Sequence, residues 1–378
     1  MIKYLYIIFL IHLFALEEAS LALLYGVLLL FIVNRKDVVK NKMQFLILGL
    51  IFSLNVLLIP FVGVCWRELA LLMWFLLLLV YFRNKNISIR EFVKFVNNTY
   101  VCYLFLSVLV TFHIIQPGFT GEEMNQFDID VGNSTMTTLV GFSGTTAAID
   151  SYSSIVLLIN LLFSTGKIRL LFSSISLLAM LLTFRFTPLV AMGFASSVIF
   201  LRENKLITLY KLFVVTFCAF SFFVPLFYIE DLDFLDEITH SRAKIWIEYW
   251  YIWISSGISS MLFGIRQQHL PEIIFTESQG WFSNPHSSFM RIFLFWGTLF
   301  YFVFVVYLYK VVLRILNKKN LAIVSLVLVC AVTNSIVLWN ENPIYILCLV
   351  YFTYNMAIDD ETVKEDVKLV DISRDGVN

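Results

Sequence analysis

The sequence predicts an all-α integral membrane protein with about 11 or 12 transmembrane helices. Its 378 residues are 60% hydrophobic and only 14% charged, whereas soluble domains usually carry about 25% charged residues. The mean hydropathy is +0.84. Apolar runs of roughly 17 to 25 residues, with which a helix crosses about 30 Å of hydrocarbon, recur along the whole chain. The net charge is zero, so no basic field favours a nucleic acid as partner.

Each apolar run is expected to form one span. Residues 4–33 form either one span or two, because Glu17 and Glu18 interrupt them and a charge in hydrocarbon costs roughly 2.5–3.5 kcal/mol. The basic start and apolar core of residues 1–20 are typical of a signal peptide, but the spans that follow indicate a retained anchor. The other predicted spans are 43–62, 67–82, 99–116, 147–166, 169–184, 187–201, 206–228, 288–309, 321–339 and 342–357.

The loops between the spans alternate in charge, which predicts the side of the membrane on which each lies. Two outward loops are long: 117–146 has no Lys or Arg, and 229–287 has eight Asp or Glu against three Lys or Arg. We expect one polytopic domain, 1–357, and an acidic, disordered cytoplasmic tail, 358–378. The basic residues expected in the cytoplasm are Arg35, Lys36, Lys40, Lys42, Arg83, Lys85, Arg90, Lys94, Lys167, Arg169, Arg202, Lys205, Arg314, Lys318 and Lys319.

The outward loop 229–287 is too long to be a simple turn, and such loops tend to carry structure or function. In its middle, apolar residues interleave with Arg242 and Glu248, which predicts an amphipathic helix. Trp246, Trp250 and Trp253 suit the headgroup level, where an indole has one dry face and one wet edge. We therefore expect this helix to lie along the outer membrane-water interface.

Several residues in and after this loop follow the order of a known family. Arg242, three residues and Trp246 are followed by "LFGI" with Gly264, and then by "PHSSF" at the start of a span. Together with what precedes them, they cover roughly residues 180–305. This region resembles the O-antigen polymerase and O-antigen ligase superfamily of polytopic membrane glycosyltransferases.

The histidine motif of that family is His, a small polar residue, nine residues, Gly, two residues, Gly. His286, Ser287 and Gly297 match it, whereas Phe300 replaces the second glycine. Arg185 stands in an outward turn that resembles the family's Ser-Arg-Thr turn, with phenylalanine on both sides as departures. The segment "GFSGTTAAIDSYSS" is a weaker likeness, from which no arginine is carried over.

The resemblance implies a glycosyl transfer at the outer face of a bacterial inner (plasma) membrane. The donor would be an oligosaccharide repeat unit on undecaprenyl pyrophosphate, polymerised into O-antigen or capsular polysaccharide, with a chain-length regulator and a flippase as further expected partners. Guanidinium groups suit the departing pyrophosphate, and a histidine suits the acceptor hydroxyl as base. We expect no cofactor and no metal, because the sequence has neither HExxH nor paired metal ligands.

Basic residues are usually concentrated in cytoplasmic loops, so arginines in outward loops are candidates for a function. The catalytic candidates are His286, Arg242 and Arg185. The substrate-binding candidates are Arg266, Arg291, Trp246, Glu248 and Ser287. Arg291, slightly inside a span, either snorkels to the outer surface or faces a polar cavity and holds the pyrophosphate.

Simpler interpretations stand beside these. The arginines can serve as interface anchors or pair with aspartates of the loop, and His286 can be a polar residue that ends a span. A polymerase and a ligase of the same superfamily share the motifs, so the ligase is the nearest alternative. A flippase, another multispan transporter, a receptor or a structural membrane protein are alternatives of a different class. A flippase would place charges deep in several spans and have short outer loops, which this sequence does not show.

Overall fold

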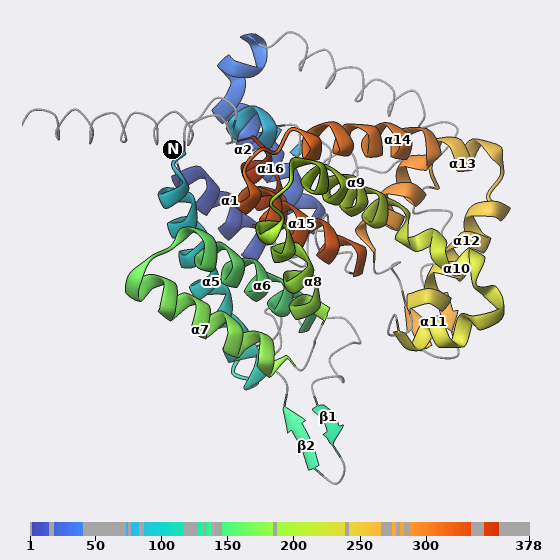
Figure 1. Cartoon of the computed structure of the whole chain (residues 1–378), viewed down its shortest axis with the longest axis horizontal. Coiled ribbons are helices and arrows are strands. Elements are labelled where there is room, and N and C mark those ends of the chain that lie inside the picture. The colour runs from blue at the N-terminus through green and yellow to red at the C-terminus, as the bar shows by residue number, and fades with distance from the viewer. Residues whose placement is uncertain are drawn as a thin grey trace, which may run out of the picture.

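The computed structural model is built almost entirely of helices, packed around a central α15 (Lys318–Thr333) (Figure 1). The structure describes residues 2–14, 19–40, 73–74, 77–82, 87–115, 128–131, 134–137, 139, 146–183, 187–238, 242–265, 274–276, 280–282, 287–333 and 344–354. Its other helices are α1 Lys3–Phe14, α2 Ala19–Lys40, α5 Ile89–Thr111, α6 Thr146–Phe163, α7 Gly166–Leu182, α8 Thr187–Ser197, α9 Asn204–Phe220, α10 Val224–Phe227, α11 Leu232–Ile238, α12 Arg242–Ser255, α13 Ile258–Phe263, α14 Ser288–Leu313 and α16 Ile344–Tyr354, with short 3-10 turns η3 Val198–Phe200, η4 Ser221–Phe223 and η5 Ile229–Asp231.

Among the described residues, three helices are long and apolar enough to cross a membrane: Ile89–Thr111, Asn204–Phe227 and Ser288–Leu313. They agree with the prediction of an α-helical membrane protein. The number of spans stays a prediction, because several predicted spans are shorter helices here. The predicted span 43–62 lies outside the described residues, as does much of 67–82.

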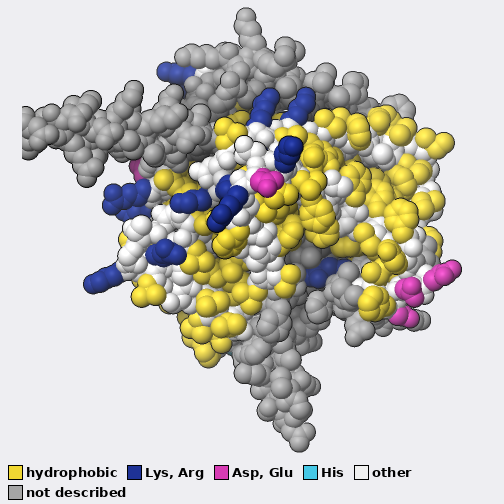
Figure 2. Space-filling model, in the orientation of Figure 1, with side chains coloured by type: hydrophobic (Ala, Val, Ile, Leu, Met, Phe, Trp, Pro, Cys, Tyr) yellow, Lys and Arg dark blue, Asp and Glu magenta, His cyan; other side chains and the backbone are white. Residues whose placement is uncertain are grey.

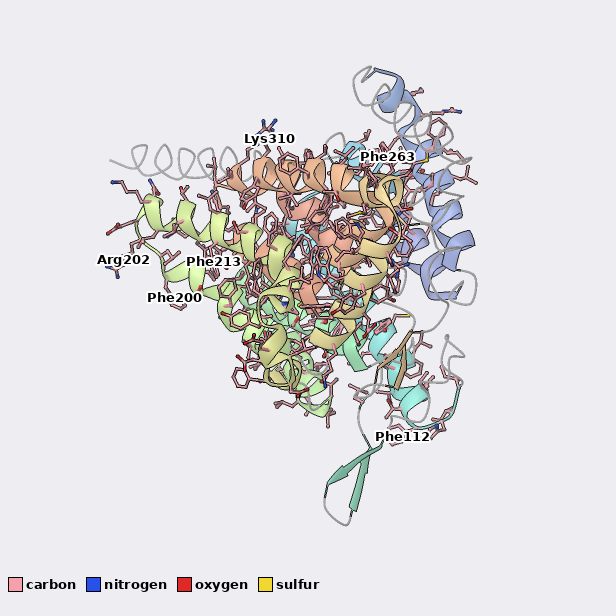
Figure 3. All side chains as sticks on the ribbon, turned by 90° about the vertical axis from the view of Figure 1, so that its right-hand side faces the viewer. Phe112, Phe200, Arg202, Phe213, Phe263 and Lys310 are labelled. Carbon is pink, nitrogen blue, oxygen red and sulfur yellow. The ribbon has the colours of Figure 1, made fainter. Side chains whose placement is uncertain are left out.

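Charged side chains divide between two ends of the molecule. Figure 2 shows most Lys and Arg side chains toward the upper left and a group of acidic side chains at the right-hand end, near α11. Arg202 and Lys310 lie on one side of the molecule in Figure 3, while Phe112 and the β1–β2 hairpin lie on the opposite side. This separation matches the predicted division of the loops, and which end faces the cytoplasm stays a prediction.

The first apolar stretch forms two helices. α1 ends at Phe14, α2 begins at Ala19, and the two pack against each other. Glu17 and Glu18, which prompted the alternative of two short spans, lie outside the described residues. At 12 residues, or about 18 Å, α1 is shorter than the bilayer hydrocarbon.

α5 begins ten residues before the predicted span 99–116. Ser88 and Glu91 form a capping box: the Ser88 hydroxyl accepts from the Glu91 amide at 3.3 Å, and the Glu91 carboxylate accepts from the Ser88 amide at 3.3 Å. Two amide groups at the helix end are therefore satisfied. The helix thus starts within the polar segment that precedes the apolar run.

Buried polar side chains join α5 to α6. Asn97 and Asn160 exchange two hydrogen bonds of 3.0 and 2.8 Å, and the Thr99 and Tyr152 hydroxyls are 2.7 Å apart. An apolar cluster extends this contact to α16, where the rings of Phe92 and Tyr351 stack at 3.8 Å. Such bonds satisfy polar groups that would otherwise be costly in a membrane interior.

Two short hairpins interrupt the helical fold. β1 (Asp128–Val131) pairs antiparallel with β2 (Ser134–Thr137), and β3 (Ile274–Thr276) pairs with β4 (Gly280–Phe282). Each lies in one of the two long loops predicted to face outward. The all-α prediction therefore holds for the helical body and misses these strands.

Candidate functional site

α12 carries the first candidate residues on a helix that is largely buried. Trp246 is 4% exposed, Trp250 is 3% exposed, and the Trp250 indole donates to the Phe222 carbonyl at 3.0 Å. Arg242 and Glu248 are only partly buried. The prediction that these indoles face the lipid headgroups is wrong, because they pack inside the protein. Trp246 consequently offers little surface to a substrate.

The first half of α14 is also buried, from Ser288 to Phe295. The Ser287 side chain, itself fully buried, caps this helix by accepting from the Met290 amide at 3.4 Å. Ser287 thus has a structural task, which is compatible with its place in the histidine motif but is no evidence of substrate contact.

Arg291 lies on the buried half of α14 and is only 7% exposed. The central carbon of its guanidinium group lies 4.9 Å from the centroid of the Phe295 ring, a distance suited to a cation–π interaction. Its charge also acts on the phenol of Tyr249 on α12. Arg291 therefore points into the α12–α14 contact, so the alternative that it snorkels to the surface does not hold.

Aromatic rings pack the rest of this contact. Phe293 lies 5.0 Å from both Trp250 and Trp253, measured between ring centroids, and 5.5 Å from Phe222 of η4. Tyr301 completes the cluster against Phe293 at 5.4 Å. The two chain segments that carry the family resemblance are thus held in one core.

Two glycines of the resembling motifs meet where α13 crosses α14. Gly297 has φ 75° and ψ 170°, which breaks α14, and Gly264 has φ 100° and ψ 150°. A Cβ on Gly264 would lie 2.1 Å from the Phe295 carbonyl oxygen, and one on Gly297 would lie 2.3 Å from the Leu262 carbonyl oxygen. Only glycine allows both this backbone conformation and this approach.

Hydrogen bonds fix the same crossing. The Ile265 amide donates to the Leu294 carbonyl at 2.7 Å, and the Thr298 hydroxyl donates to the Met261 carbonyl at 2.9 Å. The break at Gly297 leaves the carbonyl of Leu294 available to Ile265, because the regular helical ladder stops there.

An exposed ion pair joins the first turn of α12 to α11. Lys244 of α12 contacts Asp233 of α11 at 2.8 Å, and Asp233 is exposed. The hydrogen bond and the positive charge of Lys244 lower the pKa of the Asp233 carboxyl. Asp233 is one of the loop aspartates considered as partners of the arginines, and its ion pair with Lys244 is the contact described here.

The other three candidates, Arg185, Arg266 and His286, lie outside the described residues. The structure therefore brings together Arg291 and the helix of Arg242, Trp246 and Glu248, and it leaves the grouping with His286 as a prediction. Sequence reasoning counted Tyr249 only among the apolar residues of this helix, although its spacing of seven residues from Arg242 places both on one helical face, and it is close enough for the charge of Arg291 to act on it. No group of three or more His, Cys, Asp or Glu suited to a metal occurs in the described part of the chain.

Comparisons with protein-family models, with curated proteins and with solved structures found no match to this chain. The family resemblance accordingly rests on the motifs quoted above.

Proposed function

We propose that this protein is a membrane glycosyltransferase that polymerises oligosaccharide repeat units carried on undecaprenyl pyrophosphate, at the outer face of a bacterial inner membrane. The observation that supports it best is the joint packing of two motif segments, one with Arg242 and Gly264 and the other with Ser287, Arg291 and Gly297. This packing is compatible with a shared site, although successive helices often pack together.

The proposed reaction is a displacement at the anomeric carbon of the donor. The acceptor hydroxyl oxygen bonds to that carbon, the bond from the carbon to the pyrophosphate oxygen breaks, and the hydroxyl proton passes to His286. Arg242, Arg185 and Arg291 would neutralise the departing pyrophosphate, and Arg266, Glu248 and Ser287 are the further proposed substrate-binding residues. Planar guanidinium groups match phosphate oxygens in pairs, which explains arginine in place of lysine.

Arg291 offers an anion only a small surface, but a strongly attracting one. The residue is 7% exposed, and its charge acts through a low dielectric, where attraction to a pyrophosphate is far stronger than in water. Arg242, less buried at the start of α12, suits the entrance to such a site.

Deletion of the gene in its host, followed by gel analysis of the surface glycan, separates the candidate functions. Loss of a polymerase leaves single repeat units on the acceptor, whereas loss of a ligase leaves none. Unchanged surface glycan contradicts both.

Single variants test the site. We expect Arg242→Ala and His286→Ala to abolish long chains at normal protein levels, because the loss of one charge-stabilising group commonly costs about 10² to 10³ in rate. Arg202→Ala is the matched control, since Arg202 is exposed on the predicted cytoplasmic side. Full activity of either site variant rules out the role assigned to that residue.

A further inference from the structure

We infer that α12 and α13 form a re-entrant hairpin that dips into the outer leaflet of the bilayer and contacts lipid acyl chains. This inference concerns the surface of the outward loop and does not depend on the proposed reaction. It replaces the expectation of a helix that lies flat on the membrane.

The order of contacts along α14 shows the path of the chain. Trp250 and Trp253 lie beside Phe293, and Met261 then meets Thr298 farther along α14. Ile265 then bonds to Leu294, which lies earlier on α14 than Thr298. The chain therefore runs alongside the first half of α14, reaches its farthest point in α13, and turns back at Gly264 (Figure 3, where Phe263 marks the end of α13).

The part of the first half of α14 next to Gly297 has to lie in the bilayer if this helix crosses it. At about 1.5 Å per residue, the second half, Thr298–Leu313, covers roughly 24 Å of the ~30 Å of hydrocarbon. The first half then supplies the remaining ~6 Å, about four residues, so Thr298 lies below the outer boundary of the hydrocarbon. The part of α13 that contacts Thr298 then lies below the headgroups.

The composition of the hairpin suits hydrocarbon. Residues 249–265, "YWYIWISSGISSMLFGI", contain no charged residue, with Glu248 before them and Arg266 after them. The Ser255 and Ser256 hydroxyls donate to the Tyr251 and Trp253 carbonyls, both at 2.8 Å. Hydroxyls bonded to their own helix in this way carry little cost in lipid.

The turn back toward the surface is satisfied by protein. The Gly264 amide donates to the Ser260 carbonyl at 2.8 Å, and the Ile265 amide donates to Leu294. Non-helical backbone is tolerated at membrane depth only where protein or water supplies such partners.

The exposed face of the hairpin is apolar and continues the surface of the transmembrane helices. Ile258 is 77% exposed and Ile254 is 57% exposed, and on α14 Phe302 is 67% exposed. Figure 2 shows apolar side chains spread over the part of this face where Figure 1 places α9, α12 and α13. Because this surface is continuous with lipid-facing helices, acyl chains suit it.

Spin labels on the full chain in liposomes of phosphatidylethanolamine and phosphatidylglycerol test this. We would label Ile258→Cys and measure collision with oxygen, which enriches in lipid, and with a water-soluble nickel chelate. Phe302→Cys serves as the lipid reference and Asp231→Cys, exposed beside α11, as the water reference. The native chain, with its own cysteines, gives the background.

We expect the Ile258 label to behave like the Phe302 label, with several-fold less collision with nickel than at Asp231. A label as open to nickel as at Asp231 would place the hairpin in water, and a label poorly reached by both reagents would place it under protein. Either result overturns the inference. Ile254→Cys provides a second site if Ile258→Cys fails to elute as a single species before reconstitution.

Discussion

The crossing of α13 and α14 makes the sharpest prediction about stability. Gly257, Gly264 and Gly297 all have positive φ with ψ of 150° or more, a region open almost solely to glycine. Alanine at any of the three is strained by about 1–3 kcal/mol. Gly257 has no heavy atom within 4 Å of a built Cβ, so strain is the whole expected cost there.

Gly264 and Gly297 add a steric cost. The built Cβ atoms would lie 2.1 and 2.3 Å from carbonyl oxygens of the opposite segment, so the backbones have to move apart. Overpacking costs typically about 1–3 kcal/mol, which brings the total for Gly264→Ala or Gly297→Ala to about 2–6 kcal/mol. Moving the two backbones apart would also weaken the hydrogen bond from the Ile265 amide to the Leu294 carbonyl.

The assay is unfolding of the detergent-purified full chain, followed by the fraction that stays monodisperse after heating. Gly257→Ala controls for backbone strain. Gly193→Ala controls for the substitution itself, because a Cβ at this position of α8 would have no heavy atom within 4 Å. We expect Gly297→Ala and Gly264→Ala to unfold at clearly lower temperature than Gly257→Ala. Equal stability of Gly297→Ala and Gly257→Ala refutes the close backbone approach.

Two further predictions concern other parts of the fold. Asn97→Ala removes two buried hydrogen bonds to Asn160 and should cost about 1–3 kcal/mol in the same unfolding assay. Asn98→Ala, which removes an exposed hydrogen bond to Tyr6, is the control and should cost less. Equal effects of the two changes would mean that the buried pair is not formed. Lys244 holds the pKa of Asp233 below its unfolded value of about 3.9. This pair therefore stabilises the folded state above the unfolded pKa, and its contribution is lost as pH falls through the lower pKa of the folded state. As Asp233 is fully exposed, this contribution is small, so Asp233→Asn should lower thermal stability at pH 7 only slightly, and a marked loss would show a larger role for the pair.

Several helices lie close to where the hydrophobic pattern places them. α6 runs over Thr146–Phe163 against a predicted span of 147–166, because apolar length alone defines such a segment. The early start of α5 was readable from the Ser88-x-x-Glu91 capping box, a local signal that a search for apolar runs overlooks. Boundaries set by side-chain caps can thus be recovered from sequence.

The position of α12 could not be recovered in this way. Its charges, Arg242, Lys244 and Glu248, all fall in its first half, so the amphipathic pattern describes only the N-terminal half of the helix. The second half and α13 have no charge and follow α14 instead of the membrane surface. Likewise, the sequence shows glycines at 264 and 297 but not that their backbones touch, since such contacts depend on how distant segments pack.

The setting of Arg291 shows what kind of evidence can reveal its role. An arginine in hydrocarbon costs roughly 2.5–3.5 kcal/mol on insertion scales, and a desolvated cation–π interaction such as that with Phe295 returns about 2 kcal/mol. Most of the cost is therefore offset within the protein, and no bound anion is required to keep the side chain buried. Stability measurements on Arg291 variants would then report packing, and only the length of the surface glycan would report on the pyrophosphate. Arg291→Lys is the informative change, because it keeps the charge and removes the planar fork that phosphate recognition needs.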